Sequence, residues 1–408
     1  MSAAAWHGHA KDSPAYRRML LALLFAGLAT FAQLYSLQGV LTGLAGEFGV
    51  SPADAALSVS AATLGLALAV IPWSIAADRL GRRRTMTWAI GAAVGLGLLA
   101  ALAPSFGALI LLRFLEGVAL GGVPATALVY LHEEVQQLHA AVAAGTYIAG
   151  TTLGGLSGRL VAGPVGDLLG WRAGVLTVSV LAGVAALAFV VLAPRPRGFR
   201  PAVRGSGPGV VRRLAENLRS TRQLALYAQG FLLMGGFVAV YNYLGFRLEA
   251  PPFLLPASLA SLLFLAYLSG TATSRIAGGL SVRFGRLPVL VAAVPVILAG
   301  LAITLSASIP LVILGLVVFT GGFFAAHAIA SGWIPVLATT GRAQASGLYN
   351  FAYYAGSSAL GWVGGLFFGR YGWPGVAGFT GALALAAGVI AVVALRHAPG
   401  SRALPRTP

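Results

Sequence analysis

The sequence predicts an all-α membrane protein in which twelve transmembrane helices form two six-helix bundles. The chain of 408 residues is 58% hydrophobic and only 9% charged, whereas soluble domains carry about 25% charged residues. Twelve apolar runs approach the length of about 20 residues that a helix needs to cross a bilayer. One stretch rich in Pro, Gly and Arg, residues 194–223, divides these runs into two sets of six.

The first apolar run, 19–40, follows a basic segment, as the core of a signal peptide would. It is long enough to span the bilayer, so we interpret it as an uncleaved first helix. The predicted domains are an N-terminal bundle over 1–193, a cytoplasmic linker over 194–223 and a C-terminal bundle over 224–408. The predicted spans are 19–40, 55–76, 86–103, 107–130, 140–162, 173–193, 224–246, 257–276, 288–307, 311–334, 343–367 and 374–395.

The distribution of basic residues predicts the orientation of these spans. With the N-terminus in the cytoplasm, 22 of the 27 Lys and Arg residues face the cytoplasm and only three face the opposite side. Basic residues accumulate in cytoplasmic loops, so we expect both termini in the cytoplasm. The linker is expected to be a solvated hinge on anionic headgroups; a dedicated regulatory role is the alternative.

Composition excludes several classes of function. The chain has no cysteine, so it forms no disulfide, thiolate metal site or cysteine nucleophile. Its net charge of +17 is spread between the apolar runs, and no nucleic-acid-binding motif is present. Its one lysine is Lys11, and it has no Gly-x4-Gly-Lys-Ser/Thr loop, which argues against ATP hydrolysis. We therefore expect a monomer in the lipid bilayer, without enzymatic activity, cofactor, metal, ATP or nucleic-acid partner.

An internal repeat relates the two predicted bundles. The segment "GTYIAGTTLGGLSGRLVAG" from Gly145 resembles "GLYNFAYYAGSSALGWVGG" from Gly347, at an offset of 202 residues. The segment "DRLGRRR" from Asp78 resembles "VRFGRLP" from Val282, at an offset of 204. Parallel repeats of this kind are typical of transporters, with the substrate site near the membrane midplane between the halves.

The loop between the second and third spans identifies a family. The segment "SIAADRLGRRR" resembles the Gly-x-x-x-Asp-Arg-x-Gly-Arg-Arg/Lys signature of the major facilitator superfamily, although Ser74 replaces the first glycine. In the span 107–130, Arg113 and Gly117 fit the family's Arg-x-x-x-Gly motif. The resemblance implies the major facilitator fold and transport by alternating access. The matching loop residues are Asp78, Arg79, Gly81, Arg82 and Arg83.

This loop is expected to act as a cytoplasmic conformational latch. Asp78 is expected to meet the positive N-terminus of the span 343–367, and Arg82 to pair with Glu133, with Glu134 or with Asp78. In the second copy of the loop a valine replaces the aspartate, so the latch should be asymmetric. A basic loop that serves only orientation is the alternative. The second copy contributes Arg283, Gly285 and Arg286.

The span 140–162 carries a third pattern. Drug/proton antiporters of the superfamily have Gly-x8-Gly-x3-Gly-Pro-x2-Gly-Gly in the corresponding helix. Here Gly145, Gly154 and Gly158 fit that spacing, and Arg159 occupies the proline position. The chain therefore resembles bacterial drug and sugar efflux permeases, with one departure at Arg159.

Ionisable groups inside a membrane are costly and are functional candidates. Arg113 and Glu116 are three residues apart and share a helix face. We hypothesise that this pair couples transport to protons, with Glu116 taking up a proton when its contact with Arg113 breaks; a permanent structural pair is the alternative. Arg159 either points inward, toward Glu116 or an anionic substrate, or snorkels to the membrane interface.

Other polar side chains are confined to a minority of the spans, which fits a central cavity. Their hydroxyl and amide groups are candidates to bind substrate in an apolar pocket; contacts between helices are the alternative. Histidine is the side chain whose ordinary pKa lies near physiological pH, so His327 is a candidate for a titrating group, and a hydrogen-bonded wall residue is the alternative for it. The predicted substrate-binding residues are Gln33, Tyr35, Gln38, Arg159, Tyr241, Asn242, His327, Tyr349, Asn350 and Tyr353.

The sequence thus predicts a secondary active transporter. The favoured hypothesis is proton-coupled efflux, or antiport, of small neutral, anionic or amphipathic compounds, with the proton gradient as the energy source. An importer or exchanger of a polar metabolite, such as an organic acid or a sugar, is the alternative. A membrane scaffold or sensor is a third possibility, against which the intact latch residues argue.

Overall fold

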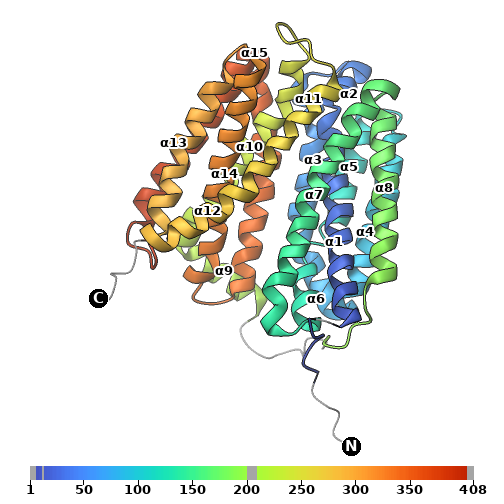
Figure 1. Cartoon of the computed structure of the whole chain (residues 1–408), viewed down its shortest axis with the longest axis vertical. Coiled ribbons are helices and arrows are strands. Elements are labelled where there is room, and N and C mark those ends of the chain that lie inside the picture. Colours follow the sequence, from blue (N-terminus) through green and yellow to red (C-terminus); the bar gives the residue numbers. More distant parts are fainter. Residues whose placement is uncertain (1–5, 12, 200–208, 402–408) are drawn as a thin grey trace, which may run out of the picture. The chain divides into compact units, whose positions relative to one another are not determined.

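The computed structural model describes the chain except for residues 1–5, 12, 200–208 and 402–408 (Figure 1). The described residues form helices, and none of them forms a β-sheet. Their contacts divide the chain into two units: unit 1, Met1–Gly43 with Ala61–Arg204, and unit 2, Leu44–Ser60 with Gly205–Pro408.

The predicted all-α fold is confirmed, because each of the twelve predicted apolar runs lies on helical segments. The first half of the chain contains α1 (Pro14–Leu34), the 3-10 helix η1 (Ser36–Gly39), α2 (Leu41–Phe48), α3 (Pro52–Leu80), α4 (Arg82–Ala101), α5 (Phe106–Leu120), α6 (Ala127–Glu134), α7 (Gln137–Leu169) and α8 (Trp171–Leu192). The second half contains α9 (Val210–Arg219), α10 (Thr221–Leu248), α11 (Ala257–Leu262), η2 (Leu263–Tyr267), α12 (Leu268–Phe284), α13 (Arg286–Thr304), α14 (Ile309–Leu337) and α15 (Arg342–Leu395).

Nine helical segments among the described residues are long and apolar enough to cross a membrane, with α11, η2 and α12 taken as one. The remaining predicted spans correspond to α7, to the pair α5 and α6, and to the second half of α15. The helix α15 covers two predicted spans, 343–367 and 374–395, because it is interrupted at Gly372, whose φ of 62° and ψ of −151° are not helical. Two predicted spans therefore meet at that residue.

The internal repeat has a structural counterpart at four glycine turns. Gly81 separates α3 from α4 with a φ of 90°, and Gly285 separates α12 from α13 with a φ of 89°. Gly170 separates α7 from α8 with a φ of 86°, in the position that Gly372 occupies within α15. Residues other than glycine adopt such positive φ angles only with strain. Both halves therefore use glycine at the same bends.

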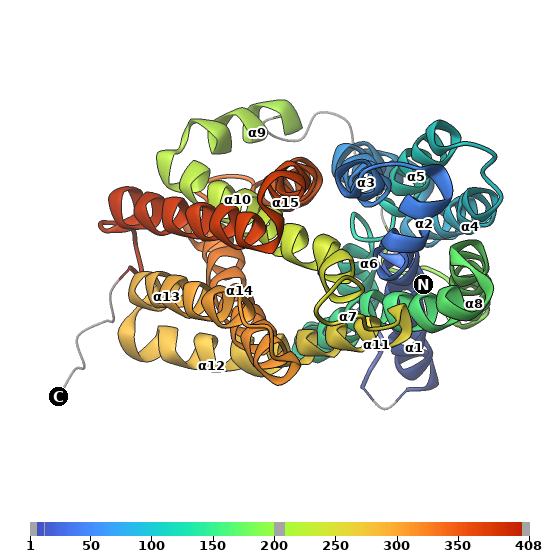
Figure 2. The ribbon, with the colours of Figure 1, turned by 90° about the horizontal axis from the view of Figure 1, so that it is seen from above.

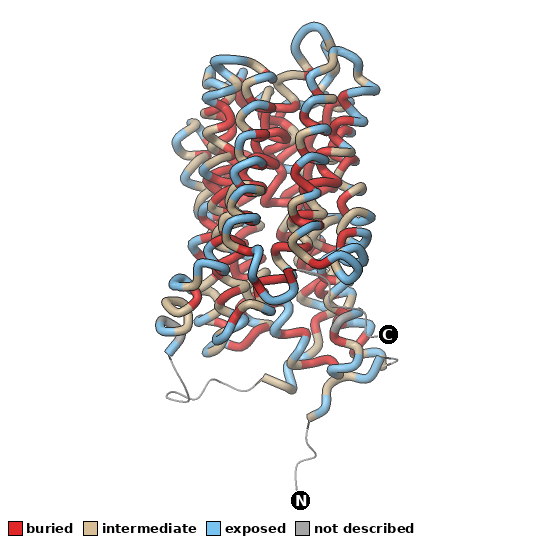
Figure 3. Tube along the Cα trace, turned by 90° about the vertical axis from the view of Figure 1, so that its left-hand side faces the viewer, coloured by how far each residue is buried: buried red, intermediate tan, exposed pale blue. Residues whose placement is uncertain are grey.

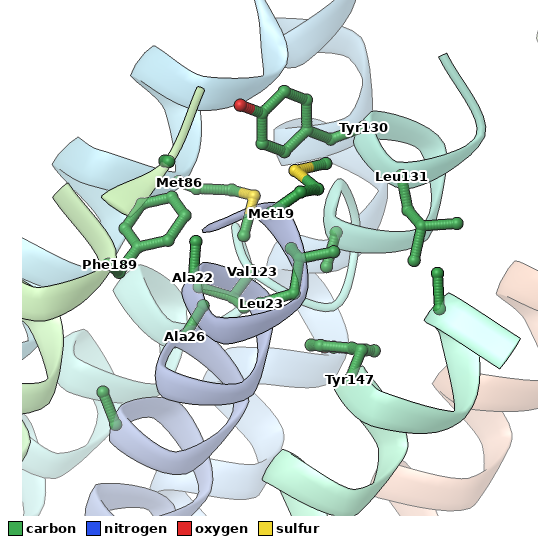
Figure 4. Packing of buried hydrophobic residues seen from close by; sticks show 14 of the residues in the cluster. Met19, Ala22, Leu23, Ala26, Met86, Val123, Tyr130, Leu131, Tyr147 and Phe189 are labelled. Carbon is green, nitrogen blue, oxygen red and sulfur yellow. The ribbon is translucent and has the colours of Figure 1, made fainter. Parts of the chain in front are cut away.

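Unit 1 has a core that fixes the first half of α1 (Figure 4). Met19 of α1, Met86 of α4, Tyr130 of α6 and Phe189 of α8 are fully buried in it. Such close packing makes the position of each helix sensitive to small changes in side-chain volume. The far end of α1, beyond this core, carries the polar groups described below.

Glycines bring α7 against α1. A Cβ atom added to Gly150, Gly154 or Gly158 would collide with backbone oxygens of α1, so only glycine permits this approach. The oxygens belong to Leu24, Leu28 and Ala32. In unit 2, Gly356 of α15 lies against the backbone of Phe231 in α10 in the same way. Gly154 and Gly158 of the pattern in the predicted span 140–162 therefore have a packing role, which Gly356 shares in the repeat.

Unit 2 is built around α14, which packs against α10, α12 and α13, while α10 also packs along α15 (Figure 2). Buried residues follow the sides of helices that face other helices, and exposed residues follow the outer sides (Figure 3). On α8 of unit 1, for example, Val184, Leu187 and Val191 are more than 60% exposed. Exposed apolar side chains of this kind are expected where a helix faces lipid.

The first turns of α3 belong to unit 2, although the predicted N-terminal bundle, 1–193, contains them. The hydroxyl of Ser60 donates to the carbonyl of Ser358 at 2.9 Å, and the hydroxyl of Ser358 donates to the carbonyl of Ser60 at 2.8 Å. A Cβ at Gly365 would also lie 2.7 Å from the Cα of Ala53. These contacts join the start of α3 to α15.

Part of the predicted linker is an ordered helix, whereas its residues 200–208 lie outside the described part of the chain. The carboxylate of Glu216 on α9 accepts from the hydroxyl of Thr340 at 2.6 Å and from Arg212 at 2.9 Å. These donors hold the pKa of the Glu216 carboxyl below its ordinary value. Asn217 also donates to the Thr340 carbonyl at 3.1 Å, so α9 is attached to the turn that precedes α15.

The glycine contacts predict a difference between two neighbouring substitutions on α7. Gly154→Ala should destabilise the protein by about 1–3 kcal/mol, because the added methyl collides with α1. Gly145→Ala is the matched control: no atom lies within 4 Å of its Cβ position, so it should be neutral or slightly stabilising. Thermal unfolding of both variants in detergent measures the difference, and equal midpoints would contradict the packing role.

Candidate functional site

The first polar feature is the end of α1. The helix stops at Leu34, Tyr35 has a φ of −111° and a ψ of 11°, and the chain continues as η1. A helix end leaves carbonyl oxygens without intrahelical partners. Arg113 of α5 is a hydrogen-bond partner for these oxygens, because its guanidinium donates to the carbonyls of Gln33 at 3.1 Å and Leu34 at 2.7 Å. A cation is also favourable at the negative end of a helix dipole.

Arg113 is paired with Glu116 in the interior of unit 1. Its guanidinium lies 2.6 Å from the Oε2 atom of Glu116, and both residues are fully buried. The Oε1 atom of Glu116 has no hydrogen-bond partner among the described residues. It lies with Gln33 Nε2 and Ser179 Oγ around the position that a Cβ on Gly97 would occupy, at 3.1, 2.7 and 2.9 Å respectively.

These contacts place Glu116 between α5, α1, α4 and α8. The carboxylate is directed toward Gly97 on α4 and Ser179 on α8, while Arg113 connects α5 to the end of α1. A buried carboxylate and guanidinium that lose their partner are strongly unfavourable. The pair therefore links α5 to the end of α1.

Arg159 lies on the other side of the α1 break and is only 1% exposed. Its Nε atom donates to Gln38 Oε1 at 2.6 Å, and its NH1 atom donates to the Gly155 carbonyl. Its guanidinium also lies over the Tyr35 ring, 4.1 Å from the centroid, which adds a cation–π attraction. A snorkelling arginine keeps its charged group at the interface, and this degree of burial does not fit that interpretation.

The predicted binding residues of unit 1 therefore fall into two sets. Gln33 belongs with Arg113 and Glu116, and its side-chain amide donates to the Ala93 carbonyl at 3.4 Å. Tyr35 and Gln38 belong with Arg159. Both sets meet at the α1 break, residues 33–38, which is bound by one arginine from α5 and another from α7.

Unit 2 offers an uncharged aromatic surface. His327 Nδ1 and the Tyr349 hydroxyl lie 2.9 Å apart, and the His327 ring centroid is 4.8 Å from that of Tyr353. On its other side His327 stacks on Phe323 at 5.9 Å. Phe323 in turn stacks on Phe237 of α10 at 4.0 Å. Three predicted residues from α14 and α15 are thus brought together.

The aromatic surface continues around Tyr241. Its hydroxyl lies 2.6 Å from Thr320 Oγ1, and its ring centroid is 4.6 Å from that of Tyr267. The binding residues predicted from the sequence are polar and do not include the phenylalanines between them. The spacing of four residues from Phe319 to Phe323 to His327 places the three on one helix face, and this signal was available. The phenylalanines of the surface are Phe237, Phe264, Phe319, Phe323 and Phe324.

The two predicted asparagines of unit 2 are placed differently. Asn242 of α10 is 1% exposed, and a Cβ on Gly361 would lie 3.6 Å from its Nδ2 atom. Asn350 of α15 is exposed. Only the first is therefore packed between helices of unit 2, although both lie on helices that carry aromatic surface residues.

The predicted latch residues of unit 1 form a network around Arg82. Its Nε and NH2 atoms donate to Glu133 Oε1 at 3.1 and 3.0 Å, and its NH1 atom lies 2.5 Å from Asp78 Oδ1. Arg83 instead donates to the Val190 carbonyl of α8 at 2.9 Å, and Arg79 is exposed. Arg82 thus joins the end of α3 to the end of α6.

The second copy of the loop lacks this network. Val282, in place of the aspartate, is 84% exposed. Arg283 lies over the neighbouring ring of Phe284 at 5.0 Å, and the backbone N–H of Arg286 donates to the Gly400 carbonyl at 3.1 Å. The asymmetry expected from the valine is therefore present in the side-chain contacts.

Known proteins share both the sequence and the fold. Residues 23–358 match the family described as the Major Facilitator Superfamily. The chain belongs to this superfamily. It is 40% identical over 370 residues to the inner membrane transport protein YnfM of Escherichia coli, covering 90% of this chain and 88% of the relative. It is 36% identical to the uncharacterized MFS-type transporter YybF of Bacillus subtilis, covering 90% and 91%.

Solved structures of the superfamily have the same fold at low identity. A bacterial homologue of the human lysosomal transporter Spinster, in an inward-facing and occupied conformation, aligns with a TM-score of 0.75 at 16% identity, covering 97% of this chain and all of that one. A D-xylose–proton symporter aligns with a TM-score of 0.74 at 13% identity, covering 96% and 99%. This superfamily member is thus a multi-pass membrane transporter of small molecules, a class that is neither enzymatic nor cofactor-dependent.

The buried pair predicts a non-additive result in unfolding experiments. Arg113→Leu leaves Glu116 buried without its cation and should cost about 3–5 kcal/mol. Adding Glu116→Leu removes the uncompensated charge, so the double variant should be more stable than Arg113→Leu alone. Its residual loss relative to the wild type should reflect the two carbonyls of α1. Unfolding in mixed detergent micelles measures the three proteins, and a double variant less stable than the single one would contradict the charge argument.

Proposed function

We propose that this transporter is a secondary active exporter of small neutral, anionic or amphipathic compounds, driven by proton antiport through alternating access. The observation that carries the substrate class is the chemistry of the two buried sets. Unit 1 presents Arg159 with Tyr35 and Gln38, and unit 2 presents the aromatic surface around His327. None of the residues in either set is acidic, so neutral or anionic compounds are favoured over organic cations.

Proton coupling would act through the α1 break. Protonation of Glu116 removes the negative charge that balances Arg113, and Arg113 is the donor to the Gln33 and Leu34 carbonyls. The next residues of the same break bind Arg159. A change of charge at Glu116 would therefore alter the segment that also holds the arginine proposed to meet the substrate.

The alternative is import or exchange of a polar metabolite such as an organic acid or a sugar. Within the predicted spans of unit 1, two buried arginines, Arg113 and Arg159, stand against one buried acid, Glu116, and a surplus cation would attract a carboxylate. In either case we propose an inner-membrane location with both termini in the cytoplasm, on the basis of the basic loops.

Transport into proteoliposomes tests the proposal. Wild-type protein should take up an amphipathic or anionic compound from a ligand panel faster when the imposed pH gradient drives protons out of the vesicles, opposite to the movement of the compound. Glu116→Gln should lose this acceleration. The variant should retain gradient-independent exchange of the same compound, because the amide preserves the side-chain volume. Wild-type transport that ignores the gradient would exclude proton coupling. A Glu116→Gln variant that still moves protons with substrate would assign the carrier role elsewhere.

The latch has a test of its own. Asp78→Asn removes one of the two carboxylates bound to Arg82, so we expect normal membrane insertion and loss of transport. Val282→Asn is the matched control, since it places the same side chain at the exposed equivalent position, and it should transport like the wild type. Normal transport by Asp78→Asn would show that the loop serves only orientation.

A further inference from the structure

A cavity in unit 1 shares Arg83 with the latch loop and contains none of the residues assigned to substrate or protons. It has a volume of about 570 Å³, within the range of small-molecule sites. Four arginines and a histidine line it, and no acidic residue does. The lining residues are His9, Ala15, Arg18, Arg83, Val191, Ala193, Pro194, Arg195 and Arg197.

The backbone at the end of α8 orients two of these arginines. Arg18 of α1 donates to the Val191 carbonyl at 3.0 Å, and Arg83 of α4 donates to the Val190 carbonyl at 2.9 Å. Each guanidinium has five N–H donors, so these bonds fix the groups and leave donors for a ligand.

The segment after α8 positions the other side of the cavity. The backbone N–H of Arg197 donates to Glu134 Oε1 at 2.8 Å, and its guanidinium lies 5.5 Å from the centroid of the Trp6 ring. The N–H of His9 donates to the Glu134 carbonyl at 2.7 Å. The buried Nε2 atom of His9 has no hydrogen-bond partner among the described residues. Burial and the nearby Arg197 lower the pKa of His9.

An apolar surface runs up to the cavity along α8. Val184, Leu187 and Val191 are 62%, 64% and 62% exposed, and their spacing of three and four residues places them on one face. Val191 also lines the cavity. A ligand here would therefore meet guanidinium groups at one end and a lipid-facing helix surface at the other.

We propose that this cavity binds the phosphate group of an anionic membrane phospholipid. A guanidinium group binds phosphate through two parallel N–H donors. Basic pockets between transmembrane helices bind lipid headgroups. The apolar face of α8 favours a lipid over a soluble phosphate compound, because it accommodates an acyl chain beside the headgroup. Arg83 belongs to the latch loop, and Glu134 follows the latch residue Glu133, so the lipid would also hold the helix ends that the latch joins.

Native mass spectrometry of the delipidated full-length protein tests this site with phosphatidylglycerol as the probe. We expect the wild type to retain phosphatidylglycerol more tightly than phosphatidylcholine. Arg195→Gln should weaken retention at least threefold, and Arg18→Gln with Arg195→Gln at least tenfold. Arg17→Gln is the matched control, because Arg17 is an exposed neighbour of Arg18 that does not line the cavity, and it should bind like the wild type.

Two variants keep the test decisive if one of them unfolds. Arg195→Gln leaves the bonds to the end of α8 intact, so its effect cannot come from loss of that cap. Unchanged phosphatidylglycerol binding by the double variant, or equal losses in it and in Arg17→Gln, would overturn the site. A second experiment measures competition of inorganic phosphate and glycerol phosphate with phosphatidylglycerol. If they displace phosphatidylglycerol at equal concentration, the site takes soluble phosphate and the lipid assignment is wrong.

Discussion

The guanidinium of Arg113, bound to the carbonyls at the end of α1, is the interaction on which the polar interior of unit 1 depends. A helix that ends inside a bilayer has no water to satisfy its last carbonyls, so a donor must come from another helix. A buried guanidinium in turn needs a counter-charge, and Glu116 supplies it from one turn further along α5. The other carboxylate oxygen of Glu116, Oε1, lies 3.1 Å from the position that a Cβ at Gly97 would occupy, so a glycine leaves room for it there.

The break in α1 also creates the second polar set. Once the chain leaves the helix at Tyr35, its ring and the side chain of Gln38 are presented to α7, where Arg159 binds both. The glycines of α7 permit this by bringing its backbone close to α1. One irregular segment thus connects a buried ion pair to the group proposed to meet the substrate.

The two halves share backbone features and differ in side-chain chemistry. Glycine bends occur at matching positions, as at Gly81 and Gly285, and glycines mediate close packing in both, as at Gly154 and Gly356. The residue 202 positions after Arg159 is a glycine, Gly361, and the predicted binding residues grouped around His327 in unit 2 are aromatic rings. The two halves therefore combine a shared backbone scaffold with unlike side-chain chemistry.

Apolar periodicity, motif spacing and composition determined the twelve spans, the superfamily and the pairing of Arg113 with Glu116, because each of these depends on residues near one another in the chain. Candidate partners of Arg82 could also be named, since opposite charges at adjacent helix ends are few. The tertiary structure decided which distant groups meet: Gln38 and Arg159 are 121 residues apart, and the aromatic surface joins α10 to α14 and α15. Hydropathy specifies that a helix is buried, but the partner of each buried group depends on how closely and at which face two helices pack.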